Sequence, residues 1–314
     1  MIRVFSYVFS LLFLGAASVH AEDASKLVRV GYQKSGALLL VKNEGTLEKA
    51  LKPKGYEVVW TEFTAGPPLI EALNAGSLDL GHSGEGPVIF AQATGVPLVY
   101  LGNTDASPDS AAIVVPKDSP LKTVADLKGK QVAFAKGSSA HYLVAKALES
   151  AGLTFADIKP VYLSPPDGRA AFQAGKVDAW GIWDPFFAAA EVSASARVLV
   201  PGKGLTPHRE FYFGRKEYAE EHPEVVAAFL DVLNVSGQKA ESDPKATAAF
   251  LANKLGLPLP VLERSELRKK RYYAHPLTPE IVAEQQGVAD LFLAQGLIKK
   301  PIQVASAVYR PTAH

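Results

Sequence analysis

Two adjacent serines, Ser138 and Ser139, are the residues whose type and position most clearly suggest chemistry. They end the turn Lys136-Gly137-Ser138-Ser139, which follows a short apolar run at residues 132–135. Apolar positions then recur at helical spacing, so the stretch predicts a strand, a tight turn and a helix. Either serine can cap this helix, and the N–H groups of its first turn favour a negative group. The turn is therefore either a plain helix cap or a binding site for a small anion.

Other kinds of reactive site are missing from the sequence. There is no cysteine, so no thiol can act as a nucleophile. Ser83 and Ser138 lie near glycines, but neither is the centre of a G-x-S-x-G motif. The seven histidines form no H-E-x-x-H pattern, and Gly137 is not followed by the lysine of a nucleotide P-loop. We therefore expect no catalytic residue, no metal site and no cofactor.

The order of predicted elements indicates the fold class. Strands are predicted at residues 27–32 and 57–63, with a helix over residues 37–51 that Pro53 ends. Strands and helices continue to alternate until about residue 215, which predicts an α/β fold with mostly parallel sheets. The chain beyond that point is predicted to be largely helical.

Two pairs of segments resemble each other in the same order. Residues 30–37 resemble residues 132–139, and residues 73–79 resemble residues 172–178, at a separation of about 100 residues in both cases. Each likeness alone could be generic α/β sequence. Together they favour two lobes of similar build, with a turn and a helix start from each lobe facing a common cleft.

Polar and aromatic residues follow several predicted strands. Gln33 begins one turn, His82-Ser83-Gly84-Glu85 forms a second, and Trp183-Asp184-Pro185 ends a third strand. Ligands of α/β sheets bind beyond the carboxyl ends of strands, so these side chains can line the cleft. Core packing is the alternative for Trp183. Hydroxyl, amide and N–H donors beside aromatic rings suit a small anion with an apolar tail.

Composition limits the location and partners of the protein. The formal net charge is +1, which gives no footprint for nucleic acid or an acidic membrane. A basic start, an apolar run too short to span a bilayer and Val19-His20-Ala21 predict a signal peptide over residues 1–21. A retained anchor is the alternative. With no cysteine and Met1 as the sole methionine, the cleaved chain would contain no sulfur, as expected of a protein made when sulfur is scarce.

These stretches carry a family likeness. VGYQK at residues 30–34, KGSS at residues 136–139 and WDP at residues 183–185 occur in the order typical of sulfonate-, taurine- and nitrate-binding proteins. FTAGP at residues 63–67 and the stretch LKGKQVAFAKGSS at residues 127–139 favour alkanesulfonates. Over nearly all of the mature chain, the sequence resembles the periplasmic aliphatic sulfonate-binding proteins of ABC importers.

The resemblance implies a type II periplasmic-binding-protein fold, with a mixed, mostly parallel sheet in each lobe and a cleft between them. The implied lobes are residues 22–114, then 115–214, and a return to the first lobe over residues 215–314. It also implies export to the periplasm, a monomer, and delivery of a small aliphatic sulfonate to a membrane permease for sulfur acquisition.

The same resemblance implies a set of ligand-binding residues. Glu85 is the uncertain member, because some relatives have Asp there and its longer side chain could instead pair with Lys34 or Lys136. The candidates carried over by position are Gln33, Ser83, Gly84, Glu85, Gly137, Ser138, Ser139, His141, Trp183 and Asp184.

Four alternatives remain at this point. A taurine-binding protein would need carboxylates facing the ammonium group, and a nitrate-binding protein would have no tail for Trp183 to cover. Enzymes that resemble this fold, a desulfinase and pyrimidine synthases, depend on cysteine or on cysteine with histidine, and this chain has no cysteine. A regulator's effector domain would be preceded by a DNA-binding helix pair rather than by a signal peptide.

Overall fold

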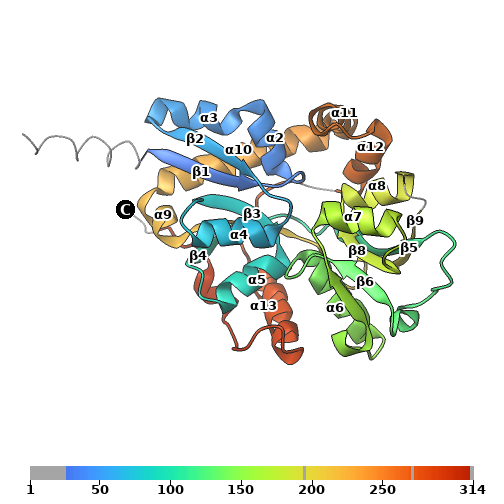
Figure 1. The fold of residues 1–314 in the computed structure, drawn as a ribbon. Helices are drawn as coiled ribbons and strands as arrows, with labels where there is room; N and C mark the ends of the chain where they lie inside the picture. Colours follow the sequence, from blue (N-terminus) through green and yellow to red (C-terminus); the bar gives the residue numbers. More distant parts are fainter. Residues whose placement is uncertain (1–25, 194–195, 270–271, 312–314) are drawn as a thin grey trace, which may run out of the picture.

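The computed structural model describes residues 26–193, 196–269 and 272–311, so the predicted signal peptide lies outside the described residues. The chain forms two lobes, each built on a five-stranded sheet covered by helices (Figure 1). In each sheet three neighbouring strands run parallel, and the fourth strand in the order pairs antiparallel with both of its neighbours. The predicted two-lobed α/β fold is confirmed.

The first lobe contains the sheet with strand order β2-β1-β3-β10-β4. One apolar core packs this sheet against α2 and α10, and a second packs its other face against α4, α5 and α13. The strands are β1 Leu27–Tyr32, β2 Glu57–Glu62, β3 Leu80–Gly84, β4 Leu98–Asn103 and β10 Glu210–Arg215. The helices are α2 Ala37–Glu44, α3 Thr46–Leu51, α4 Gly66–Asn74, α5 Glu85–Ala93, α9 Lys216–Glu221, α10 Pro223–Ser242 and α13 Pro279–Ala294.

The second lobe contains the sheet with strand order β7-β6-β8-β5-β9. Its cores pack one face against α6 and the other against α7 and α8. The strands are β5 Ala111–Pro116, β6 Gln131–Phe134, β7 Lys159–Tyr162, β8 Ala179–Trp183 and β9 Ala196–Pro201. The helices are α6 Ser139–Ser150, α7 Pro165–Gln173 and α8 Phe186–Ser193, and the pair α11 Pro244–Leu255 and α12 Leu259–Arg268 follows α10. Short 3₁₀ helices occur at Lys52–Lys54, Pro108–Ser110, Val124–Leu127, Phe155–Asp157 and Val304–Ala307.

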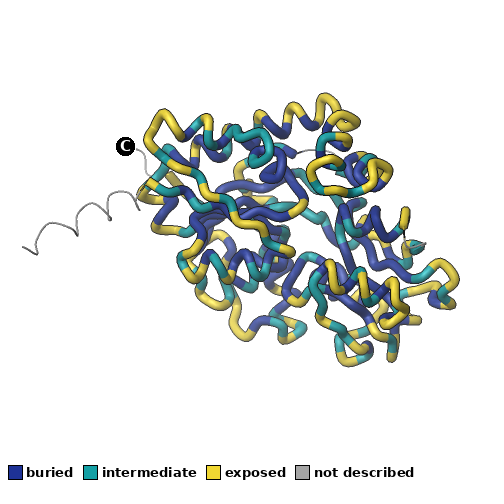
Figure 2. Tube along the Cα trace, turned by 45° about the horizontal axis from the view of Figure 1, so that its top comes forward, coloured by how far each residue is buried: buried dark blue, intermediate teal, exposed yellow. Residues whose placement is uncertain are grey.

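The contact between α12 and α8 ties the C-terminal third of the chain to the second lobe. Figure 1 shows α11 and α12 beside α8, whereas α9, α10 and α13 surround the first sheet. Figure 2 shows that buried residues follow the strands of both sheets, while the outer faces of the helices are exposed. The residue boundaries inferred for the lobes, 22–114, 115–214 and 215–314, stay a prediction.

The internal likeness seen in the sequence corresponds to one local structure that occurs twice. In the first lobe, Asp79 precedes β3, and its carboxylate accepts the backbone N–H of Arg29 in β1 at 2.9 Å. In the second lobe, Asp178 precedes β8 and accepts the backbone N–H of Gln131 in β6 at 2.7 Å. The two aspartates thus fix the start of equivalent strand pairs, which explains why the same residue type recurs at this position.

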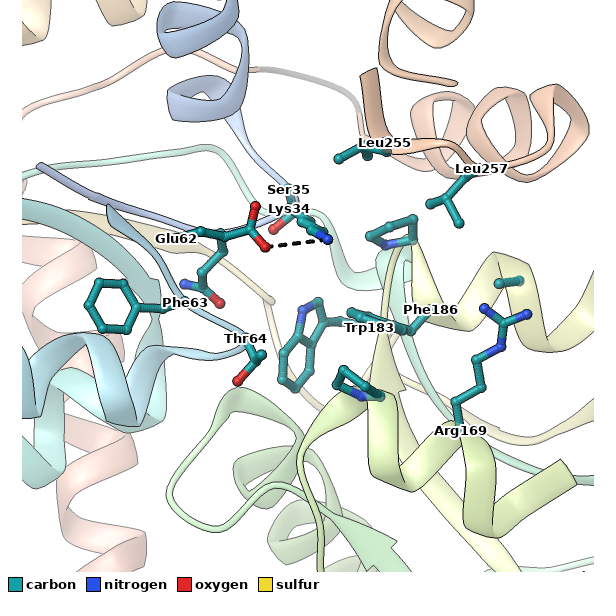
Figure 3. A pocket seen from close by; sticks show the side chains of 14 residues that line it. Lys34, Ser35, Glu62, Phe63, Thr64, Arg169, Trp183, Phe186, Leu255 and Leu257 are labelled. Carbon is teal, nitrogen blue, oxygen red and sulfur yellow. Dashed lines mark ion pairs between the residues drawn. The ribbon is translucent and has the colours of Figure 1, made fainter. Parts of the chain in front are cut away.

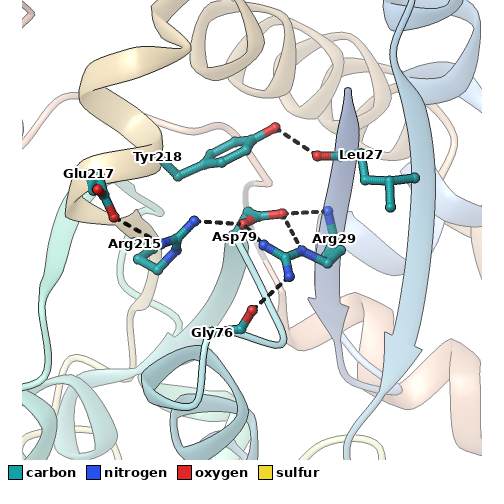
Figure 4. A network of polar contacts seen from close by, with 7 residues as sticks. All are labelled: Leu27, Arg29, Gly76, Asp79, Arg215, Glu217 and Tyr218. Atoms are coloured by element: carbon teal, nitrogen blue, oxygen red, sulfur yellow. Dashed lines mark hydrogen bonds and ion pairs between the residues drawn. The ribbon is translucent and has the colours of Figure 1, made fainter. Parts of the chain in front are cut away.

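Asp79 is also the centre of a larger ionic network, shown in Figure 4. Its side chain is fully buried and pairs with the Arg29 guanidinium at 2.6 Å and with Arg215 at 3.5 Å. Arg29 additionally donates to the carbonyl of Gly76 at 2.7 Å. A buried carboxylate is tolerated here because two guanidinium groups and a backbone N–H compensate the loss of water.

We expect Asp79→Ala to lower the free energy of unfolding by roughly 2–4 kcal/mol, because it leaves Arg29 and Arg215 without their carboxylate partner. This expected loss is smaller than for fully buried ion pairs, because the Arg29 and Arg215 side chains are 35% and 25% exposed and can be rehydrated. Asp178→Ala, which removes the equivalent hydrogen bond without an ion pair, should cost about 1 kcal/mol. Urea unfolding of both variants measures the difference. Equal losses would contradict the role assigned to the arginine pairs.

The helix predicted over residues 37–51 is two helices, α2 and α3. Gly45 separates them with φ of 64°, a left-handed conformation that few residues other than glycine adopt easily. The prediction was wrong at this point because the apolar pattern runs through the break. The direction change turns α3 onto the edge of β2 and leaves the start of α2 at the cleft.

Candidate binding cleft

Three adjoining pockets line the boundary between the lobes, and all three are bounded by Ser35 and Trp183. The inner pocket, of about 30 Å³, is lined mostly by polar residues from both lobes. A second pocket, of about 40 Å³, lies against Asp184, His208 and Lys269 and is called the hinge pocket below. The outer pocket, of about 170 Å³, is largely apolar and shares Gln33 with the inner pocket. Together they form one cleft with a small polar end and a larger apolar end.

The inner pocket brings together six of the ten residues that the sequence singles out. They come from the turn after β1, the end of β3, the start of α6 and the end of β8, which no short stretch of chain connects. The six residues are Gln33, Ser83, Gly84, Ser138, Ser139 and Trp183. The parallel strands explain this meeting, because their carboxyl ends lie at the same edge of each sheet.

The two serines at the start of α6 have different surroundings. The Ser138 hydroxyl accepts from the N–H groups of Ala140 and His141 and donates to the Ala135 carbonyl at 2.7 Å. Ser138 is therefore the helix cap. Ser139 is half-buried, faces the first lobe, and has a first-turn N–H without an acceptor inside the helix. The capping alternative describes Ser138, whereas Ser139 lines the inner pocket and its hydroxyl also hydrogen-bonds Glu85.

The two lobes meet closely at this point. A Cβ atom on Gly84 would lie 1.8 Å from the Ser139 hydroxyl oxygen, and one on Gly86 would lie 2.7 Å from the Ser138 carbonyl oxygen. Such distances are far below van der Waals contact, so only glycine allows the end of β3 to reach the start of α6. The lobes are therefore closed on each other in this structure.

A hydrogen-bonded chain from β10 orients Gln33. The backbone N–H of Gln33 donates to His82 Nε2 at 3.3 Å, so the proton of a neutral His82 lies on Nδ1, which donates to Glu210 at 3.1 Å. The Gln33 amide donates to the His82 carbonyl at 3.1 Å, which leaves its second N–H for the pocket. Burial alone would raise the pKa of Glu210, but His82 and Lys269 hold it below its usual value.

Glu85 lies beneath the inner pocket and not at its surface. The carboxylate is buried and accepts the Arg209 backbone N–H at 2.7 Å. Burial raises the pKa of Glu85 to about 7, although hydrogen bonds from Arg209 and Ser139 oppose the shift. The two lysines considered as its partners are engaged elsewhere: Lys34 pairs with Glu62 at 3.3 Å, and Lys136 lies over the Tyr162 ring.

Glu85 should make stability depend on pH. Between about pH 4.5 and 7, the unfolded chain releases this proton while the folded chain keeps it, so stability falls as pH rises through that window. The shift corresponds to about 3 kcal/mol at most. We expect Glu85→Gln to remove this fall, measured by urea unfolding at pH 5 and pH 8. Glu71→Gln, on the exposed surface of α4, is the control; parallel pH profiles of wild type and Glu85→Gln would contradict the assignment.

Three other candidate residues lie away from the inner pocket. Asp184 borders the hinge pocket, accepts the Ala188 N–H at 2.9 Å and pairs with Arg268 at 3.2 Å. Burial raises the pKa of Asp184 to about 6, against the attraction of Arg268. His141 packs among the rings of Phe134 and Phe155, and burial lowers its pKa to about 4.

Gly137 and His141 line none of the three cleft pockets in the described part of the chain. Gly137 has φ of 76°, and its N–H donates to His141 Nδ1 at 3.1 Å, so the pair shapes the turn that presents Ser138 and Ser139. Direct ligand contacts of Gly137, His141, Glu85 and Asp184 stay a prediction.

Trp183 separates the polar and apolar ends of the cleft. Figure 3 shows its indole ring projecting into the outer pocket between the two lobes. Apolar walls surround it on both sides, and the ring is partly exposed rather than buried in the core. These walls are Phe63, Pro166, Pro185, Phe186, Ala189, Leu255 and Leu257.

Several cleft residues were not singled out from the sequence. Ser35 borders all three pockets, and its place in the turn after β1 was a usable signal. Leu255 and Leu257 reach the outer pocket from α11 and the loop behind it, and Arg169 reaches it from α7. No local pattern could have revealed these three, because they enter the cleft only through the packing of distant helices.

Neither metal binding nor a membrane span is indicated within residues 26–193, 196–269 and 272–311. No group of three His, Asp or Glu side chains in these ranges is arranged to hold a metal ion. No helix there combines the length and apolar character needed to cross a bilayer.

The chain is similar in sequence to known proteins over most of its length. Residues 54–247 match the family described as NMT1/THI5 like. An aliphatic sulfonates-binding protein of Escherichia coli (strain K12) is 42% identical over 303 residues, covering 96% of this chain and 94% of that protein.

Two solved structures are also similar over almost the whole chain. The alkanesulfonate-binding protein SsuA from Xanthomonas axonopodis pv. citri, bound to MOPS, has a TM-score of 0.86 at 43% identity, with 91% of this chain and 98% of that one covered. The periplasmic aliphatic sulphonate binding protein SsuA from Escherichia coli has a TM-score of 0.82 at 42% identity, with 92% and 94% covered.

Proposed function

Because the chain belongs to the NMT1/THI5-like family and to its aliphatic sulfonate-binding proteins, we propose that its cleft binds an aliphatic sulfonate in the periplasm. The protein is the substrate-binding component of an ABC importer and not an enzyme, and it delivers its ligand to a membrane permease. The observation that carries the proposal is the polar inner pocket, with donors from both lobes, opening past Trp183 into an apolar outer pocket.

The inner pocket supplies what a sulfonate headgroup needs. A sulfonate is anionic at physiological pH and carries three acceptor oxygens, so hydrogen-bond donors and a helix N-terminus hold it without a matched lysine. The donors are the Gln33 amide, the Ser83 hydroxyl and the Ser139 N–H, together with the Ser139 hydroxyl, which also hydrogen-bonds Glu85. Ser83 is buried and lines the inner pocket, and its hydroxyl forms no side-chain hydrogen bond within the described residues, so it is available.

The apolar pocket favours sulfonates over the two runner-up ligands. Nitrate has no carbon chain to bury against Trp183 and Phe186. The ammonium group of taurine would need a free carboxylate, but Glu62 at the outer pocket is engaged by Lys34 at 3.3 Å and by the Tyr32 hydroxyl at 3.1 Å. Burying the charge of taurine would therefore cost free energy without a compensating partner.

A binding screen tests the proposed function. Alkanesulfonates from one to eight carbons, taurine, nitrate and sulfate are compared by thermal shift and calorimetry. A ligand that binds only the folded state, at about 100 times its dissociation constant, stabilises the protein by about 2.7 kcal/mol. We expect this for alkanesulfonates. Tighter binding of nitrate or taurine than of every alkanesulfonate would overturn the substrate, and binding of none of these ligands would overturn the function.

Export is part of the same proposal. The sequence at residues 19–21 predicts cleavage after Ala21, so the protein recovered from the periplasm should begin at Glu22. Intact-mass measurement of that material gives the result directly. A periplasmic species that retains Met1 would contradict cleavage and favour an N-terminal anchor.

A further inference from the structure

The charged side chains that line the cleft are almost all neutralised by protein partners. In the hinge pocket, Asp184 pairs with Arg268 at 3.2 Å, and Lys269 pairs with Glu266 at 3.0 Å. In the inner pocket, Arg209 pairs with Glu284 at 2.6 Å. His82 and Glu210, which also border the inner pocket, pair with each other at 3.1 Å. A ligand in these two pockets therefore meets no charged side chain that lacks a polar partner.

The outer pocket contains one ion pair and one charged side chain without a polar partner among the described residues. Lys34 and Glu62, both from the first lobe, neutralise each other at 3.3 Å. Arg169, from α7 of the second lobe, lines the same pocket and has neither an ion pair nor a hydrogen bond to any described residue. Among charged residues of the three pockets in the described ranges, Arg169 alone has no polar partner. Arg169 as a whole residue is half-buried, so its charge is not fully screened by water.

The position of Arg169 matches the path of a ligand tail. The inner and outer pockets share Gln33, Ser35 and Trp183, so a molecule held by its headgroup in the inner pocket extends past the indole into the outer one. Figure 3 shows the guanidinium beyond Phe186, on the far side of Trp183 from the Lys34–Glu62 pair. A tail passing along Trp183 first meets apolar walls and then five N–H donors in a fixed planar group.

We propose that the preferred ligands are sulfonates whose carbon tail ends in a second anionic group; this proposal rests on the proposed function. Arg169 is the residue that determines this preference, because a guanidinium binds a carboxylate or a second sulfonate through paired hydrogen bonds. The apolar walls accept the methylene groups between the two anions. A cationic tail is disfavoured, since it meets the Arg169 charge while Glu62 is already occupied.

The test compares ligands that differ only at the tail end. Calorimetry at fixed, low ionic strength measures binding of ω-sulfonated carboxylates of three to six carbons, their methyl esters, and the matching α,ω-disulfonates. The wild-type protein should bind the best sulfonated carboxylate at least about tenfold more tightly than its ester, as for one charge-assisted contact. Comparison of the carboxylate and disulfonate series identifies which anion fits the guanidinium.

Substitutions at Arg169 provide the decisive comparison. Arg169→Gln should bring the carboxylate-to-ester affinity ratio close to one, and Arg169→Glu should shift the preference toward ω-aminoalkanesulfonates. Lys176→Gln is the matched control, because it removes the same charge from an exposed position just beyond the end of α7, outside the cleft pockets. The control should keep the wild-type ratio.

The outcomes separate this inference from the function on which it rests. A wild-type protein that binds simple alkanesulfonates as tightly as their dianionic counterparts overturns the role of Arg169 and leaves sulfonate binding intact. If the carboxylate-to-ester affinity ratio falls equally in Arg169→Gln and Lys176→Gln, the effect arises from net charge alone. That result would also overturn the role of Arg169. Absence of binding by any sulfonate overturns the proposed function itself.

Discussion

Ser139→Asp should abolish sulfonate binding, with affinity lowered by at least about 100-fold, equivalent to about 2.7 kcal/mol. The new carboxylate would lie at the N-terminus of α6, where the headgroup is proposed to bind, and would repel it at short range. It would also place a larger side chain at the contact with Gly84, where the Ser139 hydroxyl already leaves no space for a Cβ atom on Gly84. Calorimetry with the tightest alkanesulfonate measures the loss.

Two further variants make this result specific. Ser139→Ala removes the hydroxyl that is proposed to donate to the headgroup and that also hydrogen-bonds Glu85. Affinity should fall by about 10- to 100-fold, as for a hydrogen bond to a charged group. Ser150→Asp adds the same charge at the exposed far end of α6 and should bind like the wild type. Because the carboxylate introduced by Ser139→Asp would face the buried Glu85, thermal unfolding without ligand must show that this variant is folded. Unchanged affinity in a folded Ser139→Asp protein would restrict this turn to helix capping.

Trp183→Ala should flatten the dependence of affinity on tail length. Each buried CH₂ contributes roughly 0.8 kcal/mol, so wild-type affinity should rise about fourfold per carbon until the tail leaves the outer pocket. Without the indole, the first carbons beyond the headgroup lose their main apolar contact, while methanesulfonate loses little. Calorimetry across the one- to eight-carbon series gives the slope for each protein.

The controls for Trp183 test the ring and its place separately. Trp183→Phe keeps an aromatic face in the outer pocket and should retain most of the slope. Tyr162→Ala removes an exposed aromatic residue of the same lobe that lines none of the three pockets, and it should leave the slope unchanged. A Trp183→Ala protein with the wild-type slope would show that the tail lies against other walls.

Features that depend on residues close together in the sequence were predicted correctly in most cases, whereas several features that depend on distant segments were not. The strand, turn and helix around Ser138 and Ser139 follow from local periodicity and capping chemistry, and the structure confirms them as β6, the turn and α6. The two-lobed α/β fold follows from alternating elements and from the repeated segments that end at Asp79 and Asp178. Local rules failed at Gly45, because a left-handed glycine interrupts an apolar pattern without altering it.

Local sequence patterns are enough to predict the turns that carry hydrogen-bond donors and the aromatic residue next to Asp184-Pro185, and composition alone excludes cysteine chemistry. These depend on residue type and on spacing along the chain. The three-dimensional arrangement of the chain shows which donors face the cleft: Ser138 is the helix cap, Glu85 and His141 are buried, and Ser35, Leu257 and Arg169 line the pockets. The physical reason is that burial and charge pairing depend on groups from distant segments, which become neighbours only when the two lobes pack together.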